Sequence, residues 1–235
     1  MPYRRLPNTD KARLRALQNA IKKAELQSFD EQVISFKTLR DAENFLQIFE
    51  NQIDLYNHSL KNQINANKQF QQVVSNARMY ISHFIQVMNL AVIRGEIKKD
   101  QKRLYQLEPD NHNVPDLSSE RQILRWGQNI IEGENERIRN GGSPIYNPTI
   151  AKVQVHYEVF KEFELNQKLY KATTNRNWEE LVKLRKNCDA IILDIWNQVE
   201  DYFKSESPFN KLEKCKEYGL VYYYRRNENE VLSED

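Results

Sequence analysis

Histidine is the residue type in this chain best suited to metal binding and acid–base chemistry. The chain has four histidines: His58, His83, His112 and His156. A di-iron carboxylate site in a helical bundle requires Glu-x-x-His motifs, which place both ligands on one face of a helix. The residues three positions before the histidines are Leu55, Tyr80, Pro109 and Val153. The sequence therefore argues against a ferritin-like metal site.

His83 is the histidine that interrupts the most apolar stretch, beside Ser82 and Gln86. We interpret it as an interior, hydrogen-bonded histidine, because buried polar groups in proteins are normally paired. The alternative is a pocket between helices, for which His83, Tyr80 and Asp189 would have to converge.

Other residues and segments whose types could bind a ligand or take part in catalysis have simpler structural interpretations. Cys188 lies on an apolar stripe, where a thiol behaves as a small hydrophobic group. The segment 110–113 with Asp116 lacks the ligand spacing of a calcium loop, so we interpret it as a solvated loop. Gly141 to Ser143 follows a helix, which favours a C-cap over a phosphate site. Since the known nucleotide, metal and hydrolase motifs are missing as well, we predict no enzyme activity, no catalytic residue, no cofactor and no metal.

Tyrosine and arginine stand side by side at both ends of the chain. They form the predicted interaction surface: Tyr3, Arg4, Arg5, Tyr222, Tyr223, Tyr224, Arg225 and Arg226. Aromatic rings can stack on bases and arginines can hold phosphates, so nucleic-acid binding is one interpretation. The net charge of only +2, and Glu228 close behind the arginines, favour the other: the tyrosines cover the bundle and the arginines find nearby carboxylates.

Charge is distributed unevenly along the chain. The first 23 residues hold one acid, Asp10, and these bases: Arg4, Arg5, Lys11, Arg13, Arg15, Lys22 and Lys23. The last nine residues hold no base and these acids: Glu228, Glu230, Glu234 and Asp235. A basic head and an acidic tail can attract each other, or each can meet a partner.

Long helices are predicted where glycine and proline, the residues most costly inside helices, do not occur. These stretches are 8–94 and 149–207. Within them apolar residues recur at steps of three and four, the spacing of bundles and coiled coils. Polar breaks at 65–68 and 173–177 predict a turn in each stretch.

The fold class we predict is all-α: an elongated up-down helical bundle built on two long antiparallel helical hairpins. The hairpins are 39–93 and 149–203, accompanied by shorter helices at 9–27 and 119–139. A shift of 108 residues superposes the apolar stripes of the hairpins, laying Phe84 on Ile192. Duplication and the common geometry of antiparallel helix pairs both account for this match. We predict that Phe84 and Ile192 are core residues.

We interpret the whole chain, 1–235, as a single helical-bundle domain. Its expected parts are the pseudo-repeat halves 36–95 and 149–205, a loop-containing linker at 96–148 and an extended tail at 218–235. Leu220 to Tyr224 is β-branched and aromatic, which favours an extended strand. A strand must pair, either with Pro2 to Leu6 or with the same segment of a second subunit.

The function predicted from these patterns is that of a non-enzymatic helical scaffold or protein-interaction module. Its expected partner is another protein or a second copy of this chain, because the tail offers a strand that can pair with itself. The alternative is a nucleic-acid-binding protein that uses the basic first helix and the Tyr/Arg ends. The stretch 79–93 is too short and too interrupted to span a bilayer, so no membrane contact is expected. The start of the chain lacks the apolar run of a secretory signal, and two lone cysteines suggest a reducing compartment, most simply the cytoplasm.

Overall fold

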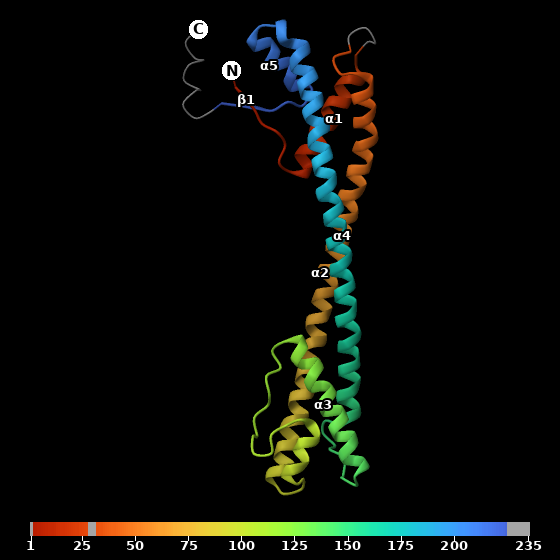
Figure 1. Ribbon diagram of the computed structural model, residues 1–235, viewed down its shortest axis with the longest axis vertical. Helices are drawn as coiled ribbons and strands as arrows, with labels where there is room; N and C mark the ends of the chain where they lie inside the picture. The colour runs from red at the N-terminus through yellow and green to blue at the C-terminus, as the bar shows by residue number, and fades with distance from the viewer. Residues whose placement is uncertain (1, 28–31, 225–235) are drawn as a thin grey trace. The chain divides into compact units, whose positions relative to one another are not determined.

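Helices dominate the computed structural model, which describes residues 2–27 and 32–224 (Figure 1). In chain order the elements are β1 (Tyr3–Arg4), α1 (Asp10–Glu25), α2 (Phe36–Ile93), the 3-10 helix η2 (Lys99–Tyr105), α3 (Glu120–Arg139), α4 (Ile150–Tyr202), the 3-10 helix η3 (Phe203–Ser205), α5 (Pro208–Glu217) and β2 (Tyr222–Tyr223). The predicted all-α bundle is confirmed, and so are the shorter helices, found as α1 and α3.

The turns predicted at 65–68 and 173–177 are wrong, and with them the two helical hairpins. The helices α2 and α4 run without interruption through these segments. Asparagine and threonine cost only a few tenths of a kcal/mol, up to about 0.7, relative to alanine within a helix. Without glycine or proline, that cost does not outweigh the hydrogen bonds and packing that an uninterrupted helix retains. Each predicted hairpin is therefore one helix, and α2 packs against α4.

The chain divides into two compact units whose boundaries differ from those of the expected halves. Unit 1 comprises residues 1–60 and 174–235, and unit 2 comprises residues 61–173. Each unit contains one part of α2 and one part of α4, because both long helices extend across the division.

In unit 1, α1 and α5 pack beside antiparallel parts of α2 and α4 (Figure 1). The antiparallel direction follows from two hydrogen bonds. Thr38 donates to Asp194 at 2.8 Å, and Gln52 donates to the carbonyl of Asn177 at 2.9 Å. The largest fully buried side chains of this unit include Leu17, Phe49, Trp196 and Tyr218.

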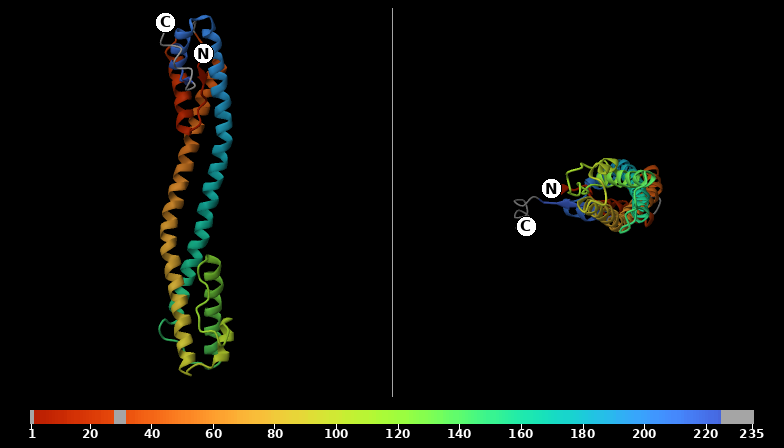
Figure 2. Two further views of the ribbon diagram at one scale, coloured as in Figure 1. Left: turned by 90° about the vertical axis from the view of Figure 1, so that its left-hand side faces the viewer. Right: turned by 90° about the horizontal axis from the view of Figure 1, so that it is seen from below.

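In unit 2, α3 lies alongside the second part of α2 and the first part of α4 (Figure 2). Phe70 stacks on Phe160 at 5.9 Å between ring centroids. The glycine at 127 permits close approach of the helices, because a Cβ there would lie 2.3 Å from the ring of Tyr157.

The predicted core positions in the two stripes are confirmed. Phe84 is 0% exposed in unit 2, and Ile192 is 1% exposed in unit 1. Both lie on the faces of their helices that carry the apolar periodicity, so the three-and-four spacing was a correct guide to burial even though the turns were not.

Unit 2 also contains a buried polar cluster that the sequence did not reveal. Arg137 binds both carboxylate oxygens of Glu134, and Tyr105 donates its hydroxyl hydrogen to the same carboxylate. Burial, followed by the bond to Glu134, raises the pKa of Tyr105. The carboxylate of Glu134 also accepts a hydrogen bond from the amide of Ile145, and Arg137 donates one to the carbonyl of Ser143. The cluster therefore attaches both η2 and the loop after α3 to α3.

Among the helices of residues 2–27 and 32–224, none has both the length and the apolar character required to cross a membrane.

Candidate interaction site

The ends of the described chain form a two-stranded antiparallel sheet in unit 1, here called the terminal strand pair. Tyr3 lies opposite Tyr223, and Arg4 lies opposite Tyr222. The amide of Arg5 donates to the carbonyl of Val221 at 2.8 Å. This confirms that part of the Leu220–Tyr224 segment is a strand, and the partner in this structure is the chain's own N-terminal segment.

Arg4 and Tyr222 fasten the terminal strand pair to α4. Arg4 donates to Glu200 at 3.0 Å, and Tyr222 donates its hydroxyl hydrogen to the same carboxylate at 2.7 Å. The guanidinium of Arg4 also lies 6.0 Å from the centre of the Trp196 ring. Burial, followed by the hydrogen bond to Glu200, raises the pKa of Tyr222. These two residues of the predicted surface therefore stabilise the packing of the strand pair on α4 within unit 1.

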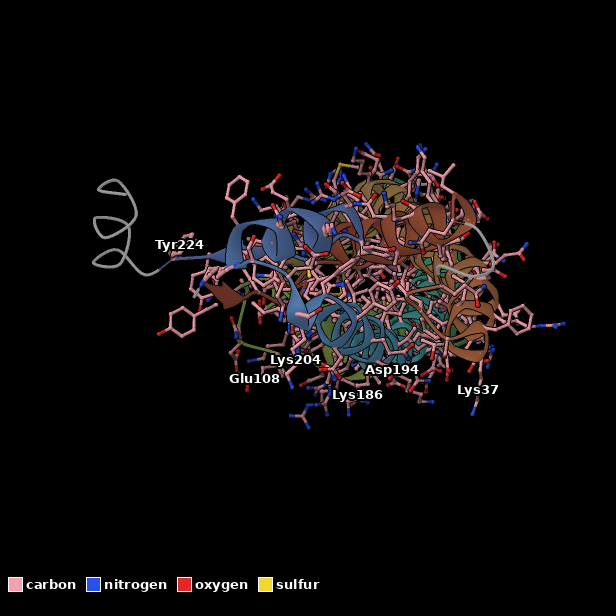
Figure 3. The ribbon with its side chains drawn as sticks, turned by 90° about the horizontal axis from the view of Figure 1, so that it is seen from above. Lys37, Glu108, Lys186, Asp194, Lys204 and Tyr224 are labelled. Atoms are coloured by element: carbon pink, nitrogen blue, oxygen red, sulfur yellow. The ribbon has the colours of Figure 1, made fainter. Side chains whose placement is uncertain are left out.

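The remaining described members of the predicted surface are more accessible. The rings of Tyr3 and Tyr223 lie 5.8 Å apart and remain 37% and 43% exposed. Arg5 is exposed and Tyr224 is partly exposed. Seen from above, Tyr224 lies at the outer end of the strand that follows α5 (Figure 3). Arg225 and Arg226 lie outside the described residues.

The outer edge of β2 presents backbone hydrogen-bonding groups. In an antiparallel pair, residues whose N–H and C=O groups bond across the pair alternate with residues whose groups point outward. Since Arg5 bonds to Val221, the facing residues Arg4 and Tyr222 direct their backbone groups outward. By the same alternation Tyr224 faces the outer edge. The sheet has two strands, so β2 has no second neighbour within the described part of the chain.

A groove of about 320 Å³, here called the N-terminal groove, lies beside the terminal strand pair. Its lining comprises Arg5, Leu6, Pro7, Asn8, Ala12, Arg15, Ala16, Asn19, Trp196, Gly219 and Val221. Two of these residues are cationic and none is acidic. Trp196 is 1% exposed, and its Nε1 is buried without a hydrogen-bond partner among the described residues. Burying an indole N–H without an acceptor is costly.

Among the polar residues of the groove, sequence reasoning placed only Arg5 in the predicted interaction surface and named Arg15 only as a member of the basic head. Asn8, Arg15, Asn19 and Trp196 come from a loop and two helices that only the packed structure brings together. The signal that existed was the excess of basic residues near the start of the chain. Nothing in the local sequence distinguishes Trp196 from the other apolar residues of its stripe.

The basic head divides into two groups of residues. Three of its members form ion pairs with carboxylates: Arg4 with Glu200, Arg13 with Asp189 and Lys23 with Glu217. The bases without a carboxylate partner in the described part of the chain are Arg5, Lys11, Arg15 and Lys22. The interpretation that the arginines of the predicted surface find nearby carboxylates therefore holds for Arg4 and not for Arg5 in the described part of the chain, and Arg225 and Arg226 lie outside it.

The expectation that His83 is an interior residue is wrong, because its side chain is exposed. The helix that carries it turns a different face to the core, with Phe84 and Ile85 buried. Tyr80 instead stacks on His156, with ring centroids 4.0 Å apart.

The other residues that the sequence offered as possible ligands or catalytic groups have structural roles. Asp189 receives two hydrogen bonds from Arg13. Cys188 is fully buried, and burial raises the pKa of its thiol to about 12. Gly141, at a φ of +86°, follows α3, and the amide of Gly142 bonds back to the carbonyl of Arg137, as in a helix C-cap. Asp110 is exposed and pairs with Lys99 at 3.0 Å.

Comparison of the chain with protein-family models, with curated proteins and with solved structures found no match.

Proposed function

We propose that this chain is a non-enzymatic helical interaction protein that binds an extended segment of a protein partner along the outer edge of β2. The observation that carries the proposal is the terminal strand pair: a sheet of two strands, fastened to α4 through Glu200, whose outer backbone groups have no strand partner in the described chain. An extended peptide added to such an edge gains main-chain hydrogen bonds.

The anchoring of the strand pair supports this proposal. An added strand needs a template that is already ordered, since otherwise binding must also offset the loss of chain entropy. Arg4 and Tyr222 supply that order by sharing the Glu200 carboxylate. The exposed rings of Tyr3 and Tyr223 then offer aromatic contact area next to the backbone groups.

The protein partner in this proposal can be a second copy of this chain. The compartment that we propose for the protein is the reducing cytoplasm. Cys188 and Cys215 are both buried free thiols, which suits such a compartment.

Nucleic acid is the second candidate, favoured by the bases on or near α1 that lack a carboxylate partner in the described chain.

The test begins with selection of short random peptides that bind the full-length protein. The Tyr224→Pro variant removes an outward N–H without removing a bond between β1 and β2, so we expect it to weaken the selected peptides about tenfold, the effect of losing one well-formed hydrogen bond to an ordered edge. The matched control is Lys186→Gln, an exposed position on α4 (Figure 3).

Three results bear on the alternatives. Peptides that bind Tyr224→Pro and the parent protein equally would remove β2 as the binding edge. Tight binding of short single-stranded DNA at physiological salt, with no peptide binding, would favour the nucleic-acid candidate. A light-scattering mass of two chains that returns to one chain in Tyr224→Pro would identify the partner as a second copy.

A further inference from the structure

We infer that the N-terminal groove is a carboxylate-binding site that receives acidic side chains of the partner segment. This inference rests on the proposed function, because the groove adjoins the terminal strand pair and shares Arg5 and Val221 with it. It adds the chemistry of the ligand, which the strand edge alone does not specify.

The charge of the groove favours a carboxylate ligand. Arg5 and Arg15 both line the groove, both are exposed, and neither forms an ion pair in the described part of the chain. The Nε of Arg15 has only a long bond, 3.4 Å, to the carbonyl of Lys11. Because no acidic residue lines the groove, a bound carboxylate would meet two cations and no like charge. Arginine is also the cation whose planar donors match a carboxylate best.

The polar side chains of the groove supply an excess of hydrogen-bond donors. The two guanidinium groups can only donate, and no carboxylate lines the groove to accept from them. Asn8 and Asn19 also line the groove and add side-chain amide donors. A ligand that carries several acceptor oxygens would satisfy the guanidinium and amide groups together, which a cationic or purely apolar ligand would not.

The groove adjoins the terminal strand pair through Arg5 and Val221. The amide of Arg5 donates a hydrogen bond to the carbonyl of Val221, and both residues also line the groove. In an extended peptide, side chains alternate between two sides. A segment bound at the strand pair therefore presents every second side chain on one face of the sheet, and acidic residues at these positions suit the two arginines of the groove.

The experiment uses two probes on the full-length protein: a peptide that alternates glutamate with valine, and the same peptide with glutamine in place of glutamate. Binding is measured by fluorescence anisotropy and by the indole N–H signal of Trp196 in NMR spectra. The chain has three tryptophans, so the signal can be assigned by comparison with Trp196→Phe. We expect the glutamate peptide to bind more tightly than the glutamine peptide and to shift this signal.

The Arg5→Gln and Arg15→Gln variants should each weaken the glutamate peptide about fivefold and leave the glutamine peptide unchanged, the effect of one partly exposed ion pair. Neither arginine side chain makes an ion pair in the described chain, so the variants should fold normally. The matched control is Lys22→Gln, which removes one exposed positive charge from the same helix but does not line the groove.

The outcomes separate this inference from the proposed function. If both peptides bind equally, if both weaken in Tyr224→Pro, and if neither responds to the arginine variants, the strand edge binds but the groove is not a carboxylate site. If neither peptide binds, the strand edge and the groove fail together. If inorganic phosphate shifts the Trp196 signal and the glutamate peptide does not, the occupant is a phosphate and the inference is overturned.

Discussion

Arg13 of α1 and Asp189 of α4 form a two-pronged ion pair, in which Nε and Nη2 of the arginine lie 2.8 and 2.9 Å from the two carboxylate oxygens. The hydrogen bond to Asp189 raises the pKa of Arg13. Asp10, at the start of α1, forms a matching pair with Arg185 of α4 at 2.7 Å. These pairs fix α1 on α4, and α1 carries Arg15 and Asn19 into the lining of the N-terminal groove.

The Arg13–Asp189 pair should contribute measurably to stability. Arg13→Gln and Asp189→Asn should each lower the free energy of unfolding by about 1 kcal/mol, because the arginine is largely covered while the carboxylate is partly solvated. Denaturant unfolding of both single variants and the double variant would give the coupling energy. Fully additive losses would mean that the two side chains act independently.

The two predicted stripe residues should be costly to truncate. Phe84→Ala and Ile192→Ala should each destabilise the protein by about 2–5 kcal/mol, because both side chains are almost completely buried and the truncation leaves a cavity. Denaturant unfolding is the measurement, with the exposed Met79→Ala as the control. A loss comparable with that of the control would contradict the assignment of either residue to a core.

Gly127 should resist enlargement because of the ring of Tyr157. Alanine normally stabilises a helix relative to glycine by about 0.5–1 kcal/mol, but here the new Cβ would lie 2.3 Å from the ring. We expect Gly127→Ala to destabilise the protein by about 1–3 kcal/mol. In a Tyr157→Ala background the same substitution should become neutral or stabilising, and a loss that persisted there would point to a clash elsewhere.

Glu134 should be among the least replaceable charged residues. Glu134→Gln leaves the buried guanidinium of Arg137 without its counter-charge, which should cost about 3–5 kcal/mol in the free energy of unfolding. The control is Glu158→Gln, which breaks the exposed pair with Lys161 and should change stability by no more than about 0.5 kcal/mol. Equal effects in the two variants would show that Arg137 is solvated in place of its partner.

The strand pair should depend on the N-terminal segment. Deleting residues 1–7 removes β1 and leaves α1 intact, so the amide of Tyr223 should exchange hydrogen faster than in the complete chain. Hydrogen-exchange mass spectrometry of the C-terminal peptides is the measurement, and the amides of α5 serve as the internal reference. Unchanged protection at Tyr223 would mean that Tyr222 and Glu200 hold β2 without β1.

The sequence by itself determined the helical class, the buried stripes and the strand at the C-terminal end of the described chain. These features follow from local patterns: three-and-four periodicity at Phe84 and Ile192, and aromatic and β-branched composition from Leu220 to Tyr224. Pairing with Pro2 to Leu6 was one of the two alternatives that the sequence offered, because prolines on both sides of Tyr3 favour an extended backbone.

Only the tertiary structure decided whether each long stripe was one helix or two, because the polar segments 65–68 and 173–177 are compatible with both and the difference depends on packing along α2 and α4. The same applies to the candidate site. The charges of Arg5 and Arg15 are visible in the sequence, but which basic residues would be neutralised depends on carboxylates that are distant in the chain, such as Asp189 and Glu200. A buried indole without an acceptor is likewise a property of three-dimensional packing, which no periodicity in the sequence encodes.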